Sequence, residues 1–315
     1  MFLEKTTLPN LGSQNRHIFR LILEISHKDR KVTAGLYFLK GPISTWGLIE
    51  RITNGRPDEI SVTFLDGWSF TQIRNYLNGL SDIQHLLLKM SDTDVKNMLK
   101  IDYPNLEGLF FPETYFIAPG QSDIEVLQIA YRLMQSKLTD LYLNRSAFAQ
   151  YTSPYQLLIM ASLIQKESAN PEDMYLISTV FNNRLRIHMK LQDDPAVFYG
   201  LSGKKSVIRR PDFQIDTPYN TYLHEGLPPT PITTPSYTAL AAASQPLNRP
   251  TLLYFIAVGH GRTRFSTTYS QHLSIENRQA KQVSPKVSNS PKKISLLVRV
   301  RKRVKAILTR KPNGE

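Results

Sequence analysis

The spacing of hydrophobic and polar residues predicts a small mixed unit in the first hundred residues. Hydrophobic positions repeat with a helical period in some segments and run together or alternate, as in strands, in others. We expect a helix at 17–25, a strand at 32–39, a helix opened by Ser44, a strand at 61–65, a helix that starts near Ser69 or Thr71, and a polar helical connector at 81–98.

The rest of the chain is predicted to be mostly helical. The segment 102–120 combines proline, glycine and aromatic residues with little periodicity, which indicates an ordered loop with short strands. We then expect helices at 123–143, 154–168, 171–189 and 236–243, a long polar loop region before the last of these, a buried strand at 252–259, and a strand end and helix at 265–279. Helices mixed with a few short strands predict an α+β fold.

Positive charge is concentrated at the C-terminal end. The 315-residue chain has a formal charge of +13, and residues 281–315 contain 11 basic residues against one acidic residue. The preceding residues are nearly neutral, with 28 basic against 25 acidic, so no nucleic-acid partner is expected. Val300, Val304 and Ile307 fall on one helical face among basic residues. This segment is therefore either suited to an anionic membrane surface or simply a solvated tail.

Other sequence features restrict the compartment and the cofactor. The chain has no cysteine, which excludes disulfides and thiol chemistry, and its histidines do not have metal-site spacing. The most apolar N-terminal stretch, 18–25, is interrupted by Arg20 and Glu24 and is far shorter than the ~18 residues that a membrane span needs. The first residues do not resemble a secretory signal peptide. We therefore expect no visible membrane anchor in this sequence.

The helix predicted at 154–168 ends in a candidate catalytic residue, Glu167. Ser153 and Pro154 are typical of the start of a helix, and the run LLIMASLI that follows is apolar on nearly every face, which predicts burial all round. Burial and the negative end of the helix dipole both raise the pKa of a carboxyl group at this position. A carboxyl group that stays protonated near neutral pH can act as a general acid. Alternatively, Glu167 is an ordinary exposed residue at a helix end.

Two later segments, LQDDPAVFYG and QIDTPYNTY, combine amide, hydroxyl and carboxyl groups with aromatic rings. Rings pack on the apolar faces of sugars and polar groups bind their hydroxyls, so this composition fits a saccharide-binding groove. Turns rich in Asx residues and tyrosine have the same composition. The candidate substrate-binding residues are Gln192, Asp193, Asp194, Asp216, Thr217, Tyr219, Asn220, Thr221 and Tyr222.

Several segments, taken in chain order, resemble the signature blocks of a known family. They are ASLIQKESA, VFNNRLRIHMKLQDDPAVFYG, IDTPYNTYLHEGLPPTPITTP, LYFIAVG and FSTTYSQH, and they resemble the endolytic murein transglycosylases of the MltG (YceG-like) family. Upstream, VTAGLYFL, SVTFLDGWSFTQI and LEGLFFPETY resemble the LysM-like subdomain of that family and the start of its catalytic domain. The resemblance implies an N-terminal segment at 1–30, a small LysM-like α+β subdomain at 31–98, a mixed α/β catalytic domain at 99–280 and a basic flexible tail at 281–315.

The resemblance also implies a reaction. It implies cleavage of the β-1,4 bond between N-acetylmuramic acid and N-acetylglucosamine, with closure of a 1,6-anhydro ring and without a cofactor or a metal. The catalytic glutamate of the family matches Glu167. The family often has a second glutamate where this chain has Gln165, and tends to have glycine where this chain has Thr230 and Ser236. Glu113 is the next candidate for the acid.

Location and partners also follow from the resemblance. Family members act on peptidoglycan glycan strands in cell-wall synthesis and control of glycan length, together with cell-wall synthesis or division proteins. They are normally anchored in the cell inner membrane by one N-terminal helix, with the catalytic domain on the periplasmic or extracellular side. This chain begins after the expected position of that helix. The alternative function is a peptidoglycan-binding or division-scaffold protein with weak catalysis.

Overall fold

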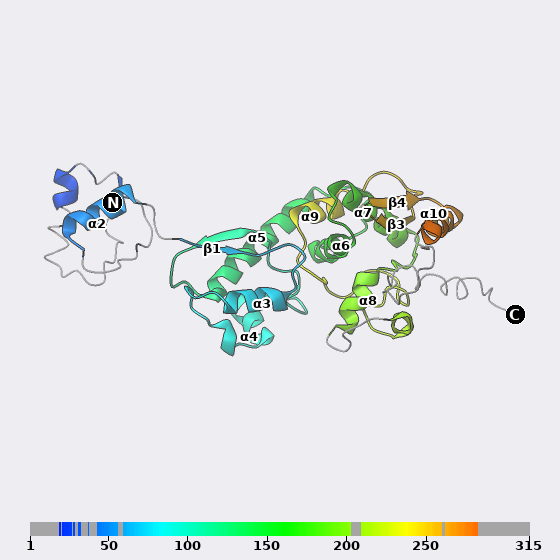
Figure 1. The fold of residues 1–315 in the computed structure, drawn as a ribbon, viewed down its shortest axis with the longest axis horizontal. Coiled ribbons are helices and arrows are strands. Elements are labelled where there is room, and N and C mark those ends of the chain that lie inside the picture. Colours follow the sequence, from blue (N-terminus) through cyan, green and yellow to red (C-terminus); the bar gives the residue numbers. More distant parts are fainter. Residues whose placement is uncertain are drawn as a thin grey trace, which may run out of the picture.

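The computed structural model describes the chain continuously over residues 59–202, 209–259 and 262–282, and in the N-terminal part over residues 19, 21–26, 28, 31–32, 37 and 43–55. Within these residues the fold is α+β, as predicted, and it is dominated by helices (Figure 1). The strands form two antiparallel two-stranded sheets, β1 with β2 and β3 with β4. The predicted strand at 32–39 lies almost entirely outside the described residues, and the predicted basic tail lies outside them apart from 281–282.

The elements follow one another along the chain in a fixed order (Figure 1). The helices are α2 (Thr45–Asn54), α3 (Phe70–Asn78), α4 (Asp92–Leu99), α5 (Asp123–Leu143), α6 (Pro154–Glu167), α7 (Pro171–Arg186), α8 (Asp194–Leu201), α9 (Tyr237–Ser244) and α10 (Tyr269–Gln282). The strands are β1 (Ile60–Thr63), β2 (Thr114–Ile117), β3 (Tyr254–Gly259) and β4 (Arg262–Ser266), and the short 3₁₀ helices are η3 (Leu87–Lys89) and η4 (Arg210–Gln214).

The first sheet joins segments that are far apart in the sequence. β1 pairs with β2 so that Ile60 lies opposite Ile117 and Thr63 lies opposite Thr114. Helix α3 begins soon after β1. Ser69 caps its N-terminus, and the side chain of Gln72 accepts a hydrogen bond from the N–H of Ser69. The sheet thus combines one strand from before position 98 with one from after it. The division into a subdomain at 31–98 and a catalytic domain at 99–280 stays a prediction.

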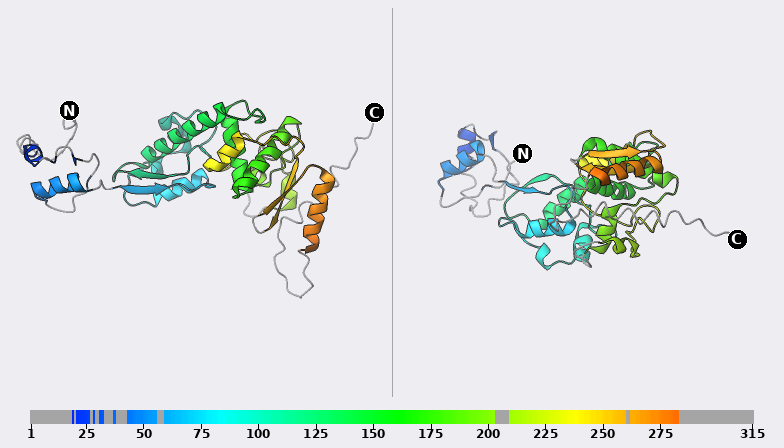
Figure 2. Two further views of the ribbon diagram at one scale, coloured as in Figure 1. Left: turned by 90° about the horizontal axis from the view of Figure 1, so that it is seen from above. Right: turned by 45° about the vertical axis from the view of Figure 1, so that its right-hand side comes forward.

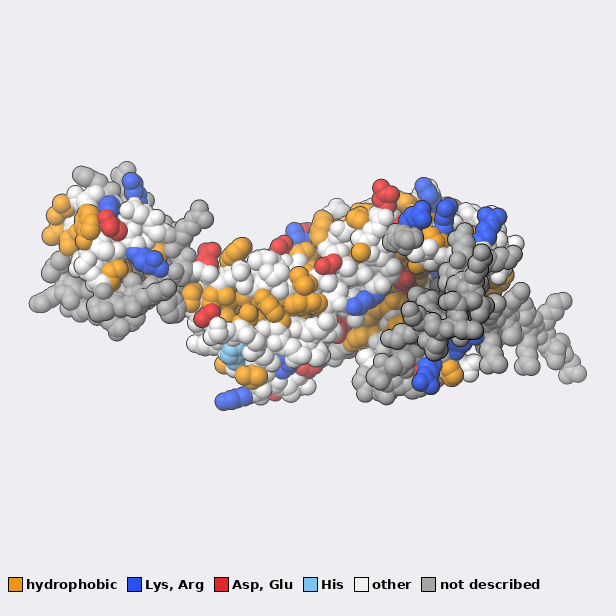
Figure 3. Space-filling view, viewed as in Figure 1, with side chains coloured by type: hydrophobic (Ala, Val, Ile, Leu, Met, Phe, Trp, Pro, Cys, Tyr) orange, Lys and Arg blue, Asp and Glu red, His pale blue; other side chains and the backbone are white. Residues whose placement is uncertain are grey.

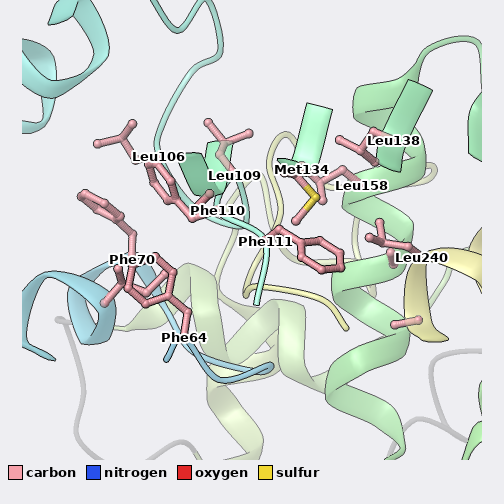
Figure 4. Close-up of a cluster of buried hydrophobic side chains, with 14 of the residues drawn as sticks. Phe64, Phe70, Leu106, Leu109, Phe110, Phe111, Met134, Leu138, Leu158 and Leu240 are labelled. Carbon is pink, nitrogen blue, oxygen red and sulfur yellow. The ribbon is translucent and has the colours of Figure 1, made fainter. Parts of the chain in front are cut away.

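Helix α6 lies at the centre of the main core. It packs against α5, α7, α8 and α9, which together surround it (Figures 1 and 2). Figure 4 shows part of this core, with Phe64, Phe70, Phe110 and Phe111 among aliphatic side chains. The rings of Phe70 and Phe110 stack with their centroids 5.3 Å apart. Close packing on every side fixes the direction of α6, and therefore the position of the residue at its C-terminal end.

The hairpin of β3 and β4 is covered by α10 on one side and contacts α7 through β3. The strand predicted at 252–259 was expected to be buried, and this expectation was wrong for most of its length. Within β3 only Ile256 is fully buried, while Phe255 is half-buried and packs edge-on against Phe181 at 5.6 Å. Because the sheet has only two strands and α7 contacts only part of it, most of its side chains stay near solvent even with α10 on one side.

The segment predicted as a helical connector at 81–98 is helical only from η3 onward. The carboxylate of Asp123 accepts hydrogen bonds from the backbone N–H groups of Leu86 and Leu87, at 3.1 and 3.0 Å. This distant side chain satisfies backbone groups that would otherwise need a helix. A second small hydrophobic cluster, Phe19, Leu23 and Ile49, lies apart from the main core, near α2 (Figure 1).

Candidate active site

Glu167 is the last residue of α6 and lies at the edge of the core. Every residue from Leu157 to Ile164 is buried, as predicted for this helix, and Ser153 caps its N-terminus. Beyond Glu167 the chain leaves the helix with a last hydrogen bond from the N–H of Ser168 to the carbonyl of Ile164, at 3.3 Å. The side chain of Glu167 is half-buried. It therefore stands between the protein interior and the surface.

Asp193 brings a second carboxyl group against Glu167. Asp193 is the N-cap of α8 and has no exposed surface, and its Oδ2 accepts a hydrogen bond from the N–H of Ala196 at 2.8 Å. Its carboxyl group also makes a hydrogen bond with the carboxyl group of Glu167. Burial, followed by the negative charge of Glu167, raises the pKa of Asp193 well above its ordinary value. Two carboxyl groups in such contact resist double ionisation.

The turn at 219–222 holds Asp193 in place. The hydroxyl oxygen of Thr221 accepts a hydrogen bond from the N–H of Asp193 at 2.8 Å and donates one to its carbonyl at 3.1 Å. The side chain of Asn220 donates two hydrogen bonds to backbone carbonyls of the preceding loop, at 3.0 and 2.7 Å. Both side chains are buried. Their polar groups stabilise the loop that positions the carboxyl pair.

Three other candidates beside the pair are half-buried: Gln192, Asp194 and Tyr222. The phenol of Tyr222 donates a hydrogen bond to Asp194 Oδ1. Gln192 has a left-handed backbone conformation, with φ of 52°, and its N–H donates to the carbonyl of Thr221 at 3.1 Å. The structure thus gathers polar groups from both predicted loop segments next to the end of α6.

Asp216 and Thr217 line an open hollow in the surface. The hollow has a volume of about 610 Å³ and its other lining residues are Pro218, His224, Leu227 and Pro229. The carboxylate of Asp216 pairs with His224 Nε2 at 2.6 Å, and both side chains are exposed. Thr217 packs against α8, since a Cβ added at Gly200 would lie 2.8 Å from Thr217 Oγ1. The hollow therefore adjoins the helix that begins after Asp193.

Two pairs of tyrosine rings pack in this region, and one of them involves α8. Tyr199 and Tyr219 pack edge to face with ring centroids 5.0 Å apart, and Tyr103 and Tyr155 stack at 4.4 Å. The hydroxyl of Tyr219 is hydrogen-bonded to Thr230 Oγ1 at 2.8 Å. Burial raises the pKa of Tyr199 and of Tyr155. These groups therefore remain protonated phenols that can donate hydrogen bonds.

Glu107 is a buried carboxyl group in the same region that sequence reasoning missed. It is 7% exposed, and its Oε1 accepts a hydrogen bond at 3.0 Å from the N–H of Phe70, the first residue of α3. Burial raises the pKa of Glu107 to about 7, although the N–H groups of Phe70 and Gly108, the charge of Lys166 and the phenol of Tyr199 act in the opposite direction. The signal in the sequence is a single acidic residue within the apolar run LEGLFF.

Gln165 and Lys166 fasten the end of α6 to the turn after β1. The amide of Gln165 donates to Asp66 Oδ2 at 3.0 Å and accepts from the N–H of Ser236 at 2.9 Å. The ammonium group of Lys166 donates to the carbonyl of Gly67 at 2.8 Å. Gln165 is thus a structural link, which gives a physical reason for an amide at this position.

Glu113, the second candidate for the acid, is not among the residues that line the hollow at Asp216 and Thr217. It is exposed and lines a smaller hollow of about 280 Å³ together with Phe64, Leu65, Asp66, Phe111, Pro112, Ser236 and Tyr237. Figure 3 shows a band of hydrophobic side chains on the β1 side of the molecule. Glu113 accepts a hydrogen bond from the N–H of the next residue at 3.0 Å.

Two elements of the site were interpreted differently from the sequence alone. α8 lies in a segment that was expected to be a loop, although Asp193 as cap and Pro195 in the first turn are helix-start signals. The role of Arg184, near the C-terminal end of α7, was also not foreseen from the sequence. The structure buries its side chain, and its guanidinium donates to the carbonyls of Leu253 and Leu191 at 2.8 and 2.7 Å. Arg184 thereby holds the loop segment that leads to Asp193.

These contacts describe an α+β protein in which a buried helix ends in a pair of contacting carboxyl groups, and in which an open hollow adjoins the helix that begins after Asp193. Two carboxyl groups in contact suit acid–base chemistry on a polar ligand. The chain belongs to the YceG-like family, which it matches over residues 6–278.

Individual relatives agree with this family. The chain is similar to an endolytic murein transglycosylase of Bacillus subtilis, with 30% identity over 256 residues that cover 76% of this chain and 71% of the relative. It is also similar to an endolytic murein transglycosylase of Streptococcus pneumoniae, with 27% identity over 272 residues that cover 76% of this chain and 49% of the relative. The chain thus spans about half the length of the streptococcal relative.

The fold agrees as well. It is similar to the crystal structure of a YceG-like protein from Listeria monocytogenes, with a TM-score of 0.54, 25% identity, and coverage of 82% of this chain and 90% of that chain. The resemblance inferred from the sequence blocks is therefore confirmed at the level of the family.

Proposed function

We propose that this protein is an endolytic murein transglycosylase in which Glu167 is the general acid and base. The relatives of that name support the lytic transglycosylase activity. The observation that supports Glu167 is its hydrogen bond with the buried carboxyl group of Asp193 at the end of a core helix. A carboxyl group held in this way can keep a proton near neutral pH.

The proposed reaction breaks one bond and forms another within the same sugar. Glu167 donates a proton to the oxygen between C1 of N-acetylmuramic acid and N-acetylglucosamine, and the C1–O bond breaks. The carboxylate then takes the proton of the C6 hydroxyl, whose oxygen bonds to C1. Glu167 regains its proton and no water is consumed. Because a substrate hydroxyl replaces the carboxylate nucleophile or activated water of ordinary glycosidases, one proton-transferring group suffices.

We assign glycan contacts to the candidates that retain exposed surface. These are Gln192, Asp194, Asp216, Tyr219 and Tyr222. The tyrosine rings offer faces for the sugars, and the carboxylates can stabilise positive charge at C1. The buried candidates Thr217, Asn220 and Thr221 hold the loops from behind.

We further propose that the protein acts on glycan strands outside the cell inner membrane, during cell-wall synthesis. Among the described residues, we find no helix with the length and apolar character that membrane crossing requires. Contacts of the basic tail with an anionic membrane, and contacts with cell-wall synthesis or division proteins, are further proposals. So is the division into a LysM-like subdomain at 31–98 and a catalytic domain at 99–280.

The test compares Glu167→Gln with Glu113→Gln on purified sacculi. The two variants make the same chemical change, one at the proposed acid and one at an exposed glutamate. We expect Glu167→Gln to lower the release of 1,6-anhydromuropeptides, measured by mass spectrometry, by about 100-fold or more, since general acid–base catalysis contributes at least that factor. Glu113→Gln should stay within a few-fold of the unmodified protein.

Three outcomes would contradict parts of this proposal. Full activity in Glu167→Gln, with loss in Glu113→Gln, would move the acid to Glu113. Products with hydrolysed reducing ends in place of anhydro ends would show a hydrolase. Sacculi that bind the unmodified protein without release of any fragment would favour the binding or scaffold function.

A further inference from the structure

The carboxyl group of Asp193 has one oxygen that is hydrogen-bonded to the backbone and one that is buried without a donor. Oδ2 is the capping atom of α8 and accepts from the N–H of Ala196. Oδ1 is fully buried, and no N–H or hydroxyl donor among the described residues reaches it. The group that contacts this carboxyl is Glu167. A buried oxygen left without a donor is costly, and a proton held between the two acids would satisfy it.

The charged groups around Asp193 favour its protonated form. From α6 it meets Glu167, and from its own helix the carboxylate of Asp194 adds a second negative charge. The 219–222 turn contributes Tyr222, whose phenol is hydrogen-bonded to Asp194. From α7, the guanidinium of Arg184 donates to backbone carbonyls of the loop segment that precedes Asp193. The two charged groups that raise the pKa of Asp193, Glu167 and Asp194, are therefore both negative.

We propose that Asp193 is a positioning residue that shares one proton with Glu167, so that the pair carries out the proton transfers of the reaction. This inference rests on the proposed function of Glu167 and goes beyond it. Asp193 is buried behind Glu167 and does not touch the glycan. It was expected among the substrate-binding residues, and we now assign it to the support of the acid.

The shared proton accounts for both chemical steps. In the resting pair, one proton lies between Asp193 Oδ1 and a carboxyl oxygen of Glu167. When Glu167 protonates the leaving oxygen, the C1–O bond breaks and the pair becomes doubly negative opposite the positive charge at C1. The pair then receives the proton of the C6 hydroxyl as its oxygen bonds to C1. The pair ends with one proton, as it began, and no other reactant is needed.

The pair sets the pH range in which the acid is available. A half-buried glutamate alone would be largely ionised near neutral pH, whereas like charge and burial delay the loss of the last proton from the pair. Asp193→Asn removes the second charge and places an amide donor against Glu167, which favours the ionised form of Glu167. The variant should therefore lose its acid at lower pH than the unmodified protein.

The experiment measures kcat for anhydromuropeptide release as a function of pH in Asp193→Asn and Asp193→Ser. Both substituents can still cap α8. We expect the alkaline limb of the profile to move down by about one pH unit or more, so that activity near pH ~7 falls about tenfold while activity near pH ~5 stays within a few-fold. The matched control is Asp123→Asn, which changes another fully buried aspartate, in the first turn of α5. It should lower thermal stability without moving the limb.

A second readout does not depend on activity. In the unmodified protein with ¹³C-labelled carboxyl groups, the signals of Asp193 and Glu167 should shift together with pH, and in Asp193→Asn the Glu167 signal should titrate at lower pH. An unmoved alkaline limb, or two independent titrations in the unmodified protein, would overturn the proposal, and the titration decides the matter even if the Asp193 variants fail to fold. Inactivity of Glu167→Gln with an unmoved Asp193→Asn profile would overturn only this inference and leave the proposed function intact.

Discussion

At the scale of single residues, Glu107 and Asp193 are both buried acids, but their surroundings differ. Glu107 accepts hydrogen bonds from two backbone N–H groups and lies near the positive charge of Lys166. Asp193 instead lies near the negative charges of Glu167 and Asp194. Glu107 therefore can be neutralised by a proton without any partner acid, and its role is to join the start of α3 to the region of α8. The pKa of Glu107 is raised by burial alone, whereas the pKa of Asp193 is raised by burial and by the charge of Glu167. Only Asp193 is therefore connected to the proposed chemistry.

Glu107→Gln should remove part of the pH dependence of stability. Because the pKa of Glu107 is raised from 4.5 to about 7, its favourable contribution is fully present below about pH 4.5 and is lost as the pH rises through about 7. The difference amounts to roughly 3 kcal/mol at most. Glutamine keeps an acceptor for the N–H of Phe70 and does not ionise. Urea unfolding followed by circular dichroism should show a flatter dependence between these pH values, while exposed Glu172→Gln should keep the original slope.

At the scale of elements, the C-terminal end of α6 is fixed by the two residues that precede Glu167. Gln165 bridges Asp66 and Ser236, and Lys166 binds the carbonyl of Gly67. An amide can donate to one partner and accept from the other, which a carboxylate cannot do. A glutamate at this position would place its carboxylate against Asp66.

Gln165→Glu should therefore destabilise the protein by about 1–3 kcal/mol, through a lost donor and two facing carboxylates. Adding Asp66→Asn supplies an amide donor again and should recover much of the loss. A double-mutant cycle on unfolding free energies measures this coupling. Additive effects of the two changes would mean that the bridge between α6 and the turn after β1 contributes little.

Arg184→Lys should cost about 2–4 kcal/mol of unfolding free energy and lower anhydromuropeptide release. Lysine cannot reproduce the two directions of the guanidinium, so buried carbonyls of Leu253 and Leu191 would lose a donor. Because the second carbonyl lies two residues before Asp193, the carboxyl pair would shift. Exposed Arg186→Lys, on the same helix, should change stability by less than about 0.5 kcal/mol. Similar losses in the two variants would argue against this role of Arg184.

Local signals explain which elements were predictable from the sequence. α5 and α6 were predicted almost to the residue because their caps and apolar spacing lie within the helices themselves. The irregular backbone near Leu86 depends on the carboxylate of Asp123, and the contact of Asp193 with Glu167 depends on the turn at 219–222. Glu167 and its polar loops were therefore visible as candidates, while the pairing of two acids became visible only in three dimensions.

At the scale of the whole molecule, the two ends of the main core are joined through one loop. Backbone hydrogen bonds link Gly67 and Trp68 with Thr234, at 2.7 and 2.8 Å, and the N–H of Ile232 donates to Ser162 Oγ of α6 at 3.1 Å. The segment around 231–234 thus connects the turn after β1 with the buried helix. A change at this segment should reach α6 and so the carboxyl pair.

Gly108→Ala tests this connection against a matched glycine. Gly108 and Gly120 both have left-handed backbones, with φ of 74° and 83°, but a Cβ at Gly108 would lie 2.7 Å from Cβ of Pro231 and 2.9 Å from the carbonyl oxygen of Thr233, whereas Gly120 has open space. Gly120→Ala should cost about 1–2 kcal/mol for the backbone alone, and Gly108→Ala about 1–3 kcal/mol more from overpacking. Urea unfolding measures both, and release of anhydromuropeptides per folded molecule should fall only for Gly108→Ala. Equal losses at the two glycines would show that the close contact with Pro231 does not position α6.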